Sequence, residues 1–270
     1  MKFAWSLGMV EDAGKRVNDP KLLWTILQEY ADGVVGVGNE VELVFSETSS
    51  LSTQTYLSTA NAMITAKDIL GREAGGLHGV ILAGSIDPGL DEIRSSTLMP
   101  VVGLTEAALA VAGFVGRKVG IITVKGSHDP LSFARVIEGI ACKYGCADRL
   151  LKNRPVRTIR EGWEEGCRYL SQAIRGDGEN FIKSFDNVAE ELLNDGADVI
   201  ICGNQLFGPI LHHLGRRSVA LDGVPIVCNV AAALKAVQLL ADLKGSVGLV
   251  KSNFGVFHSL PSSSNVKSVL

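Results

Sequence analysis

The chain has 270 residues, of which 46% are hydrophobic and 20% are charged, and its formal net charge is -3. This length and composition suffice for one large domain or two domains of ordinary size with a buried core. A net charge this small excludes strong long-range attraction to nucleic acid or acidic lipid, so we expect neither as a partner. No apolar stretch reaches the roughly 18 residues of a membrane span, and the first residues lack the features of a secretory signal. We therefore expect a cytoplasmic protein that does not bind a membrane.

Short β-branched runs alternate with longer amphipathic segments along the whole chain, which is typical of βα units around a mostly parallel sheet. In chain order, we predict strands at residues 2–7, 40–46, 79–83, 101–103, 118–124, 149–152, 198–202, 225–227 and 247–250. Apolar residues recur at helical spacing between these runs. We predict helices at residues 21–32, 54–73, 106–114, 129–144, 163–174, 180–194 and 230–243.

Two stretches, residues 79–112 and 198–237, show the same order of features. Each has a buried strand, a polar turn, a short helix, a strand led by proline and an alanine-rich helix. The copies begin about 120 residues apart, far beyond the period of a repeat array. This spacing predicts duplicated half-domains, the first made of residues 1–123 with about 244–270 and the second of residues 124–243.

The two polar turns, residues 83–88 and 202–207, follow matching strands of the two predicted halves. Parallel sheets bind ligands beyond the carboxyl ends of their strands. If the halves face each other, these turns form opposite walls of one cleft. The alternative is that each turn only connects a strand to a helix, since such turns are common in α/β folds.

The chain offers no obvious metal or cofactor site. Its five cysteines form no CxxC pair, and their odd number and scatter argue against a disulfide framework or a zinc cluster. His212 and His213 are adjacent on a predicted helix, so their side chains point about 100° apart and cannot share a metal in the usual way. Gly33, Gly36 and Gly38 follow a helix and precede a strand, the reverse of the dinucleotide-binding order. We expect neither a metal nor a cofactor.

Three segments resemble the aspartate/glutamate/hydantoin racemase superfamily, in particular its hydantoin and allantoin racemase branch. They are GVILAGSIDPGLDEIRSSTLMPVVGLTEAALAVAGFVGRKVGIITV, LLNDGADVIICGNQLFGPI and VPIVCNVAAALKAV. The resemblance implies an α/β fold of two pseudo-symmetric half-domains, each a mostly parallel sheet flanked by helices, with an active-site cleft between them. It also implies a small carboxylate or cyclic amide as substrate and a homo-oligomeric assembly.

Racemases of this superfamily carry one catalytic cysteine at the end of each matching strand, and this chain has neither. The first cysteine position falls on Gly84 and the second on Asn204. Cys202 lies two residues too early and is expected to be a thiol of the core. Glycine has no side chain, and a carboxamide has no useful basicity near neutral pH. These residues therefore exclude racemisation by the usual pair of thiols.

Polar groups around these positions are suited to holding an oxyanion or a carboxylate, through N–H groups at helix starts and through side-chain donors. The candidate catalytic residues are Ser85, Asn204, Glu106 and His128. The candidate substrate-binding residues are Gly84, Asp87, Gly203, Gln205, Thr105, Thr123, Ser127 and Ser6. Ser6 ends the first strand, where the superfamily commonly has an Asn-Pro-Asn turn for the substrate carboxylate. The absence of that turn argues against a simple amino acid as substrate.

Each candidate also has a structural interpretation. Ser85 could be a turn or capping serine, and Asp87 is expected to cap a helix that begins at Pro88. Glu106 could be a general base if burial raised its pKa, or only a first-turn glutamate favoured by the helix dipole. The run from Lys125 to His128 could bind an anion or simply start a helix.

Two functions of different classes remain open. One is an enzyme with a cysteine-free oxyanion pocket that performs isomerisation, decarboxylation or other lysis, or hydrolysis. The other is a homologue without catalytic activity that binds a small ligand or has a regulatory role.

Overall fold

The computed structural model describes residues 1–7, 17–45, 76–82, 84–125, 132–159, 161–216, 223–252 and 254. Their strands form two four-stranded parallel sheets, with the orders β2-β1-β3-β4 and β6-β5-β7-β8. The first sheet contains β1 (Lys2–Ser6), β2 (Glu40–Val44), β3 (Gly79–Leu82) and β4 (Val101–Gly103). The second contains β5 (Val119–Thr123), β6 (Val156–Thr158), β7 (Val199–Cys202) and β8 (Ile226–Cys228). The identical strand orders confirm that the two halves share one topology.

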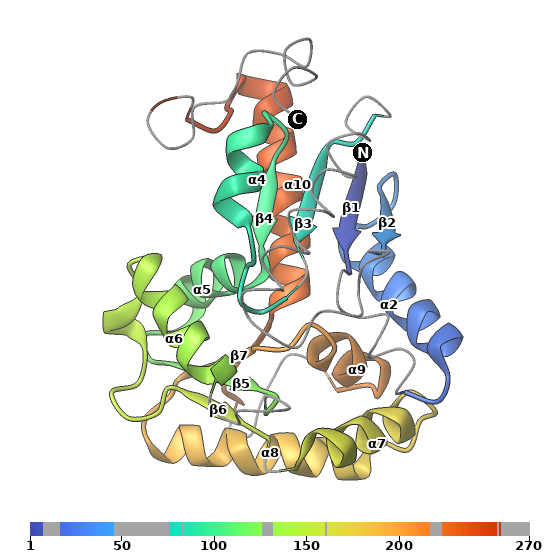
Figure 1. Ribbon diagram of the computed structural model, residues 1–270, viewed down its shortest axis with the longest axis vertical. Coiled ribbons are helices and arrows are strands. Elements are labelled where there is room, and N and C mark those ends of the chain that lie inside the picture. The colour runs from blue at the N-terminus through green and yellow to red at the C-terminus, as the bar shows by residue number, and fades with distance from the viewer. Residues whose placement is uncertain are drawn as a thin grey trace.

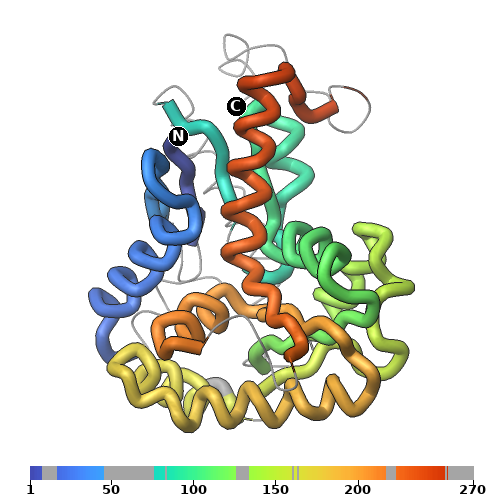
Figure 2. The backbone as a smooth tube through the Cα atoms, turned by 180° about the vertical axis from the view of Figure 1, so that it is seen from behind, coloured from blue at the N-terminus to red at the C-terminus, as the bar shows by residue number. Residues whose placement is uncertain are grey.

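Helices cover both sheets, and one long helix joins the two halves (Figure 1). The helices are α2 (Pro20–Val35), α4 (Leu90–Ser96), α5 (Leu104–Val115), α6 (Ser132–Lys143), α7 (Trp163–Ala173), α8 (Glu179–Asn194), α9 (Phe207–His213) and α10 (Asn229–Val247). Figure 2 shows α10 leaving the second half directly after β8 and running back along the first. It packs on α5, α2 and β3. The two halves are therefore tied together by packing as well as by the chain.

The central strands are apolar because both faces of each sheet are covered. All residues of β3, β5 and β7 are buried, as expected for parallel strands between helical layers. One cluster of buried apolar side chains extends from Phe3 in the first sheet through Val199 in the second to Ala241 in α10. The fold is thus built around a core that both halves share, and the predicted fold class is confirmed.

Two predicted strands are wrong. Residues 149–152 make only a single bridge, between Leu150 and Val119, after a short 3₁₀ turn η3 (Ala147–Arg149). The edge strand is β6 instead, which was missed because it is short and carries Arg157. Residues 247–250 form no strand, since α10 continues to Val247 and ends at Gly248, whose φ is 73°. The predicted helix at residues 54–73 lies outside the described residues.

The sequence predicts that β5 belongs to the first half, but β5 pairs with β6 and β7. It therefore belongs to the second sheet. The helix α10 was grouped with the second half, yet its contacts are mainly with the first. Sequence alone could not show this exchange, because the apolar pattern of a segment shows which of its faces is buried but not which sheet it packs on. We propose that the halves divide near Gly116, before β5, and again after β8.

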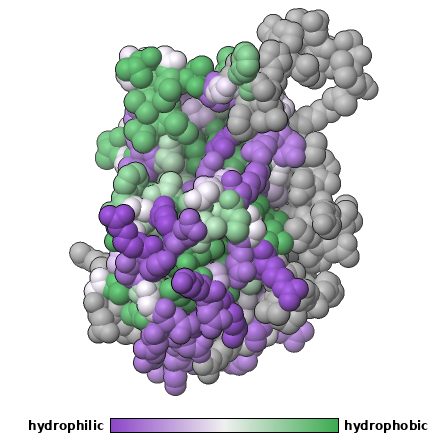
Figure 3. Space-filling model, turned by 90° about the vertical axis from the view of Figure 1, so that its left-hand side faces the viewer, coloured by the Kyte–Doolittle hydropathy of each residue, from purple (hydrophilic) through white to green (hydrophobic). Residues whose placement is uncertain are grey.

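Apolar side chains also reach the surface near the end of α10. Exposed apolar residues there include Leu98, Val247, Leu249, Val250 and Phe254. Figure 3 shows apolar surface at this upper end of the molecule, whereas hydrophilic residues gather over the lower part of the same face. Among the described residues, no helix is both long enough and apolar enough to span a bilayer.

Candidate functional site

The turns that follow β3 and β7 lie at the carboxyl ends of their strands, as the sequence predicts. In the first half, β1 and β3 run toward the half that carries the second sheet (Figure 1). In the second half, the last residue of β7, Cys202, pairs with the last residue of β8, Cys228. The next residues, Gly203 and Asn229, therefore begin the edge where a parallel sheet binds ligands.

The first turn runs from Gly84 to Asp87. Gly84 has a φ of 97°, in the left-handed region that glycine adopts without strain. The Asp87 amide donates to the Gly84 carbonyl (3.1 Å), and the Thr105 hydroxyl donates to the Ser85 carbonyl (2.6 Å). Within the described part of the chain, the Ser85 hydroxyl itself makes no hydrogen bond and is half-buried. The backbone of this turn is thus fixed, and the hydroxyl stays available to a ligand.

Asp87 caps a different helix from the one that the sequence suggests. We expected it to cap a helix beginning at Pro88, but α4 begins at Leu90, and the residue at its N-cap position is Gly89, with a φ of 69°. The Asp87 carboxylate instead accepts the amides of Thr105 (3.0 Å) and Glu106 (2.8 Å) at the start of α5. The pairing of β3 with β4 brings that helix start next to the turn.

A third donor reaches Asp87 from the second half. The Tyr144 hydroxyl, just after α6, donates to Oδ2 of Asp87 (3.0 Å). Burial raises the pKa of Asp87 from 3.8 to about 6, although the hydrogen bonds from Thr105, Glu106 and Tyr144 oppose this shift. Both oxygens of this carboxylate are engaged by the protein, so its predicted contact with substrate finds no support here. Its observed role is to hold the turn against α5.

The raised pKa predicts a pH-dependent stability. Because the folded chain holds the Asp87 proton more tightly than the unfolded chain, the stabilising contribution is complete below 3.8 and is lost as the pH rises through about 6. Relative to Asp87→Asn, the wild type should lose about 2–3 kcal/mol of unfolding free energy between about pH 3.5 and about pH 7. Urea unfolding at both pH values measures this difference. The exposed Asp148→Asn is the control, and parallel profiles for Asp87→Asn and wild type would contradict the assignment.

Glu106, the candidate general base, forms an ion pair with Arg94 of α4. Nη1 of Arg94 lies 2.8 Å from Oε1 of Glu106, and Nη2 pairs with Oε2. The same guanidinium donates to the Val101 carbonyl through Nε (2.9 Å) and Nη2 (2.8 Å). Both carboxylate oxygens of Glu106 are therefore bound by the Arg94 guanidinium in a bidentate ion pair. This geometry favours the structural interpretation of Glu106 over its role as a base.

The second turn, from Gly203 to Gln205, is held in a similar way. The Gly203 amide donates to the Ile122 carbonyl (2.7 Å), and the Thr123 hydroxyl donates to the Gly203 carbonyl (3.0 Å). Oδ1 of Asn204 accepts the Leu206 amide (2.9 Å). In the described structure, Nδ2 of Asn204 has no hydrogen-bond acceptor. Asn204 is therefore oriented by its oxygen, and its nitrogen can donate to a ligand.

The other predicted residues are distributed as follows. Thr105 and Thr123 are buried, and their hydroxyls hold the two turns. Ser6 is buried at the end of β1, and Oε1 of the nearly buried Gln205 has no partner. Ser127 and His128 lie outside the described residues. Among the described residues, no group of three metal-binding side chains occurs.

Sequence reasoning missed two polar residues next to the turns, Tyr144 and Asn229. Asn229 is fully buried, and neither atom of its carboxamide has a hydrogen-bond partner. Alignment of the two halves places Asn229 opposite the apolar Leu104, so this break in the internal repeat was a usable signal. Tyr144 gave no signal, because it contacts Asp87 across 57 residues of sequence.

The two described cysteines closest in sequence to the second turn, Cys202 and Cys228, are not available for catalysis there. Cys202 and Cys228 are buried in the core, and burial raises the pKa of both thiols. Cys202 is therefore the core thiol that the sequence predicts. A thiol in such an environment stays protonated and is unreactive as a base.

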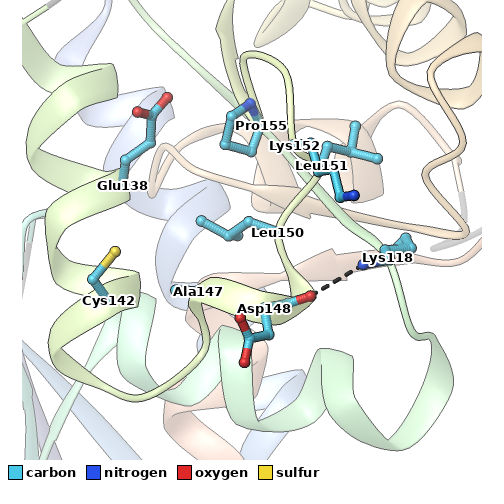
Figure 4. A pocket seen from close by; sticks show the side chains of 9 residues that line it. All are labelled: Lys118, Glu138, Cys142, Ala147, Asp148, Leu150, Leu151, Lys152 and Pro155. Atoms are coloured by element: carbon cyan, nitrogen blue, oxygen red, sulfur yellow. Dashed lines mark hydrogen bonds between the residues drawn. The ribbon is translucent and has the colours of Figure 1, made fainter.

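A separate surface pocket of about 340 Å³ lies at the opposite edge of the second sheet (Figure 4). Its lining includes Lys118, which precedes β5, and Pro155, which precedes β6. The pocket is thus next to the amino ends of the strands. Its position separates it from the two turns.

Comparison with known proteins agrees with this architecture. Residues 27–237 match the Asp/Glu/hydantoin racemase family, and the chain belongs to that family. A hydantoin racemase from Rhizobium meliloti is 27% identical over 172 residues, which are 62% of this chain and 62% of that protein. The matched part thus spans about three fifths of that relative.

Solved structures of two allantoin racemases share the fold. The protein from Klebsiella pneumoniae superposes with a TM-score of 0.70 at 20% identity, covering 97% of this chain and 94% of that one. The protein from Pseudomonas fluorescens gives 0.67 at 21% identity, covering 97% and 98%. The resemblance inferred from the sequence, to the superfamily and to its hydantoin racemase branch, is confirmed.

Proposed function

We propose that this protein is an enzyme that binds a small cyclic amide, ureide or carboxylate between the turns 84–87 and 203–205. The observation that carries the proposal is a matched pair of open donors, the Ser85 hydroxyl and Nδ2 of Asn204, on backbone that is itself held by hydrogen bonds. Such preorganised donors stabilise negative charge that develops on a substrate oxygen. The relatedness to hydantoin and allantoin racemases supports the choice of ligand class.

The reaction is proposed to differ from racemisation by two thiols. In the alignment of the superfamily pattern, Gly84 and Asn204 occupy the two cysteine positions. Cys202 and Cys228, the described thiols closest in sequence to the second turn, are buried and protonated. Isomerisation, decarboxylation or other lysis, and hydrolysis are the chemistries that an oxyanion pocket of this kind can serve.

The alternative function is a catalytically silent homologue that binds a small ligand. One observation favours it: the described carboxylates next to the first turn are already engaged, Asp87 by α5 and Glu106 by Arg94. His128, the candidate with a workable pKa, lies outside the described residues. Binding without turnover would identify this alternative.

The first experiment measures binding and proton exchange together. Hydantoin, allantoin and aspartate are titrated calorimetrically, and exchange at the α-carbon is followed by NMR in D₂O. We expect binding of a cyclic ureide without α-carbon exchange. Ser85→Ala and Asn204→Ala should each weaken binding about tenfold, the effect of one lost hydrogen bond to a charged or polarised oxygen. The exposed Ser96→Ala is the matched control.

Each result has a distinct meaning. Appreciable α-carbon exchange would contradict the exclusion of racemisation and would show that other bases have been recruited. Wild-type affinity in both alanine variants would remove this pair of turns from consideration. Binding of aspartate in preference to the cyclic ureides would reject the proposed ligand class.

We also propose that the chain forms a homo-oligomer in the cytoplasm. The exposed apolar residues near the end of α10, among them Val247 and Phe254, support self-association. Sedimentation as a monomer at micromolar concentration would reject it.

A further inference from the structure

A continuous set of hydrogen bonds connects the second half of the molecule to the first turn. Tyr144, which follows α6, donates to the Asp87 carboxylate, and that carboxylate accepts the amides of Thr105 and Glu106. The Thr105 hydroxyl in turn donates to the Ser85 carbonyl. The path ends at Ser85, whose hydroxyl is available to a ligand.

We propose that Tyr144 is a positioning residue of the binding cleft, which holds the Gly84–Asp87 turn of the first half from the second half through the Asp87 carboxylate. The expected consequence, that Ser85 is placed against a ligand, rests on the proposed function. The hydrogen bonds themselves do not depend on that function.

Tyr144 is suited to this task because it stays a donor. Burial, followed by the negative charge of Asp87, raises the pKa of Tyr144 above its ordinary value of 10. The phenol therefore keeps its proton at neutral and acidic pH. Asp87 is only 6% exposed, so water cannot replace a lost donor easily.

The charged neighbours do not replace Tyr144. Arg94 of α4 is held by Glu106 and by the Val101 carbonyl, and Glu106 of α5 repels the Asp87 charge. Lys143, beside Tyr144, pairs with Asp91 of α4. Two adjacent residues at the end of α6 therefore contact the first half. Lys143 makes the exposed contact with Asp91, and Tyr144 makes the contact with the buried Asp87.

The order of these hydrogen bonds predicts how the effects of substitutions at Tyr144 and Asp87 combine. If Tyr144 acts through Asp87, removal of its hydroxyl should have no further effect once Asp87 has lost its charge. The effects of Tyr144→Phe and Asp87→Asn should therefore not add. A tyrosine that only fills space would show no effect of Tyr144→Phe, because phenylalanine keeps the ring, and a hydroxyl that acts independently of Asp87 would give additive effects.

The experiment compares Tyr144→Phe with Tyr169→Phe in the full chain. Tyr169 is a matched control, because its hydroxyl also donates to a carboxylate, Oε1 of Glu165 (3.1 Å), on α7. Amide hydrogen exchange is followed by mass spectrometry for peptides that contain residues 84–87 and 104–106. We expect exchange there to become at least several-fold faster in Tyr144→Phe and to stay unchanged in Tyr169→Phe.

Ligand binding is measured on the same variants with hydantoin and allantoin as probes, over a range of pH. Tyr144→Phe should bind about tenfold more weakly, which corresponds to about 1.4 kcal/mol. If ionised Asp87 supports binding, affinity falls at acidic pH, and this fall should move to higher pH when the carboxylate loses a donor. Asp87→Asn and the double variant should bind equally.

Exchange that does not change in Tyr144→Phe, or additive losses in the double variant, would overturn the positioning role. Faster exchange in a protein whose wild type binds neither probe would preserve the role and would reject the proposed function instead. The two failures are therefore distinguishable.

Discussion

Gly103→Ala should destabilise the protein by about 3–5 kcal/mol, the cost of breaking a buried charged interaction. Gly103 is the last residue of β4, and its φ of -83° is ordinary, so alanine is not strained by the backbone. A Cβ at this position would lie 2.6 and 2.7 Å from the two carboxylate oxygens of Asp87. Asp87 would have to leave the start of α5, which would strand a buried carboxylate and two buried amides.

Urea unfolding measures this loss, and Gly139→Ala is the matched control. Gly139 lies in α6 with no atom within 4 Å of a Cβ, so alanine there should stabilise by about 0.5–1 kcal/mol. The second variant Asp87→Gly tests the cause. Asp87 has a φ of 44°, which glycine adopts readily, so the double variant removes the clash without backbone strain. If Gly103→Ala costs as much in the Asp87→Gly background, the clash with Asp87 is not the reason.

Gly208→Ala should destabilise by about 2–3 kcal/mol, because it overpacks the contact between α9 and β8 in the second half. Gly208 lies in α9 against the end of β8. A Cβ there would lie 2.7 Å from the Cβ of Cys228 and would contact its Sγ more closely still. The space between α9 and β8 is therefore filled by the cysteine, and the helix must supply the glycine.

The internal repeat suggests a second substitution that should restore the stability lost in Gly208→Ala. In the first half the strand residue is Gly103 and the turn carries Pro88, whereas in the second half the strand residue is Cys228 and the helix carries Gly208. Cys228→Gly should therefore recover at least about 1 kcal/mol of the loss caused by Gly208→Ala, because contacting residues couple. Thermal and urea unfolding of the single and double variants measure the coupling, with Gly33→Ala of α2 as control. Strictly additive losses would contradict it.

The sequence determined the local structure and the duplication. Continuous apolar runs such as residues 199–202 indicated strands buried on both faces, and their alternation with amphipathic segments indicated parallel sheets. The repeat of strand, polar turn and proline-led strand placed both turns at the carboxyl ends of β3 and β7. The sequence could therefore propose a candidate site at these two turns, with Ser85 and Asn204 among its residues. The edge strand β6 was not predicted, because its three residues include Arg157 and show almost no apolar pattern.

The contacts of the polar side chains, by contrast, could not be read from the sequence and depend on how the elements pack. Asp87 looks like the cap of the helix that follows it, yet it caps α5, whose amides lie 18 and 19 residues ahead. Tyr144 and Glu106 likewise take their partners from other elements, Asp87 and Arg94. The physical reason is that apolar burial has a periodicity that can be read along the chain, whereas a hydrogen bond depends on which atoms the packed elements bring within about 3 Å.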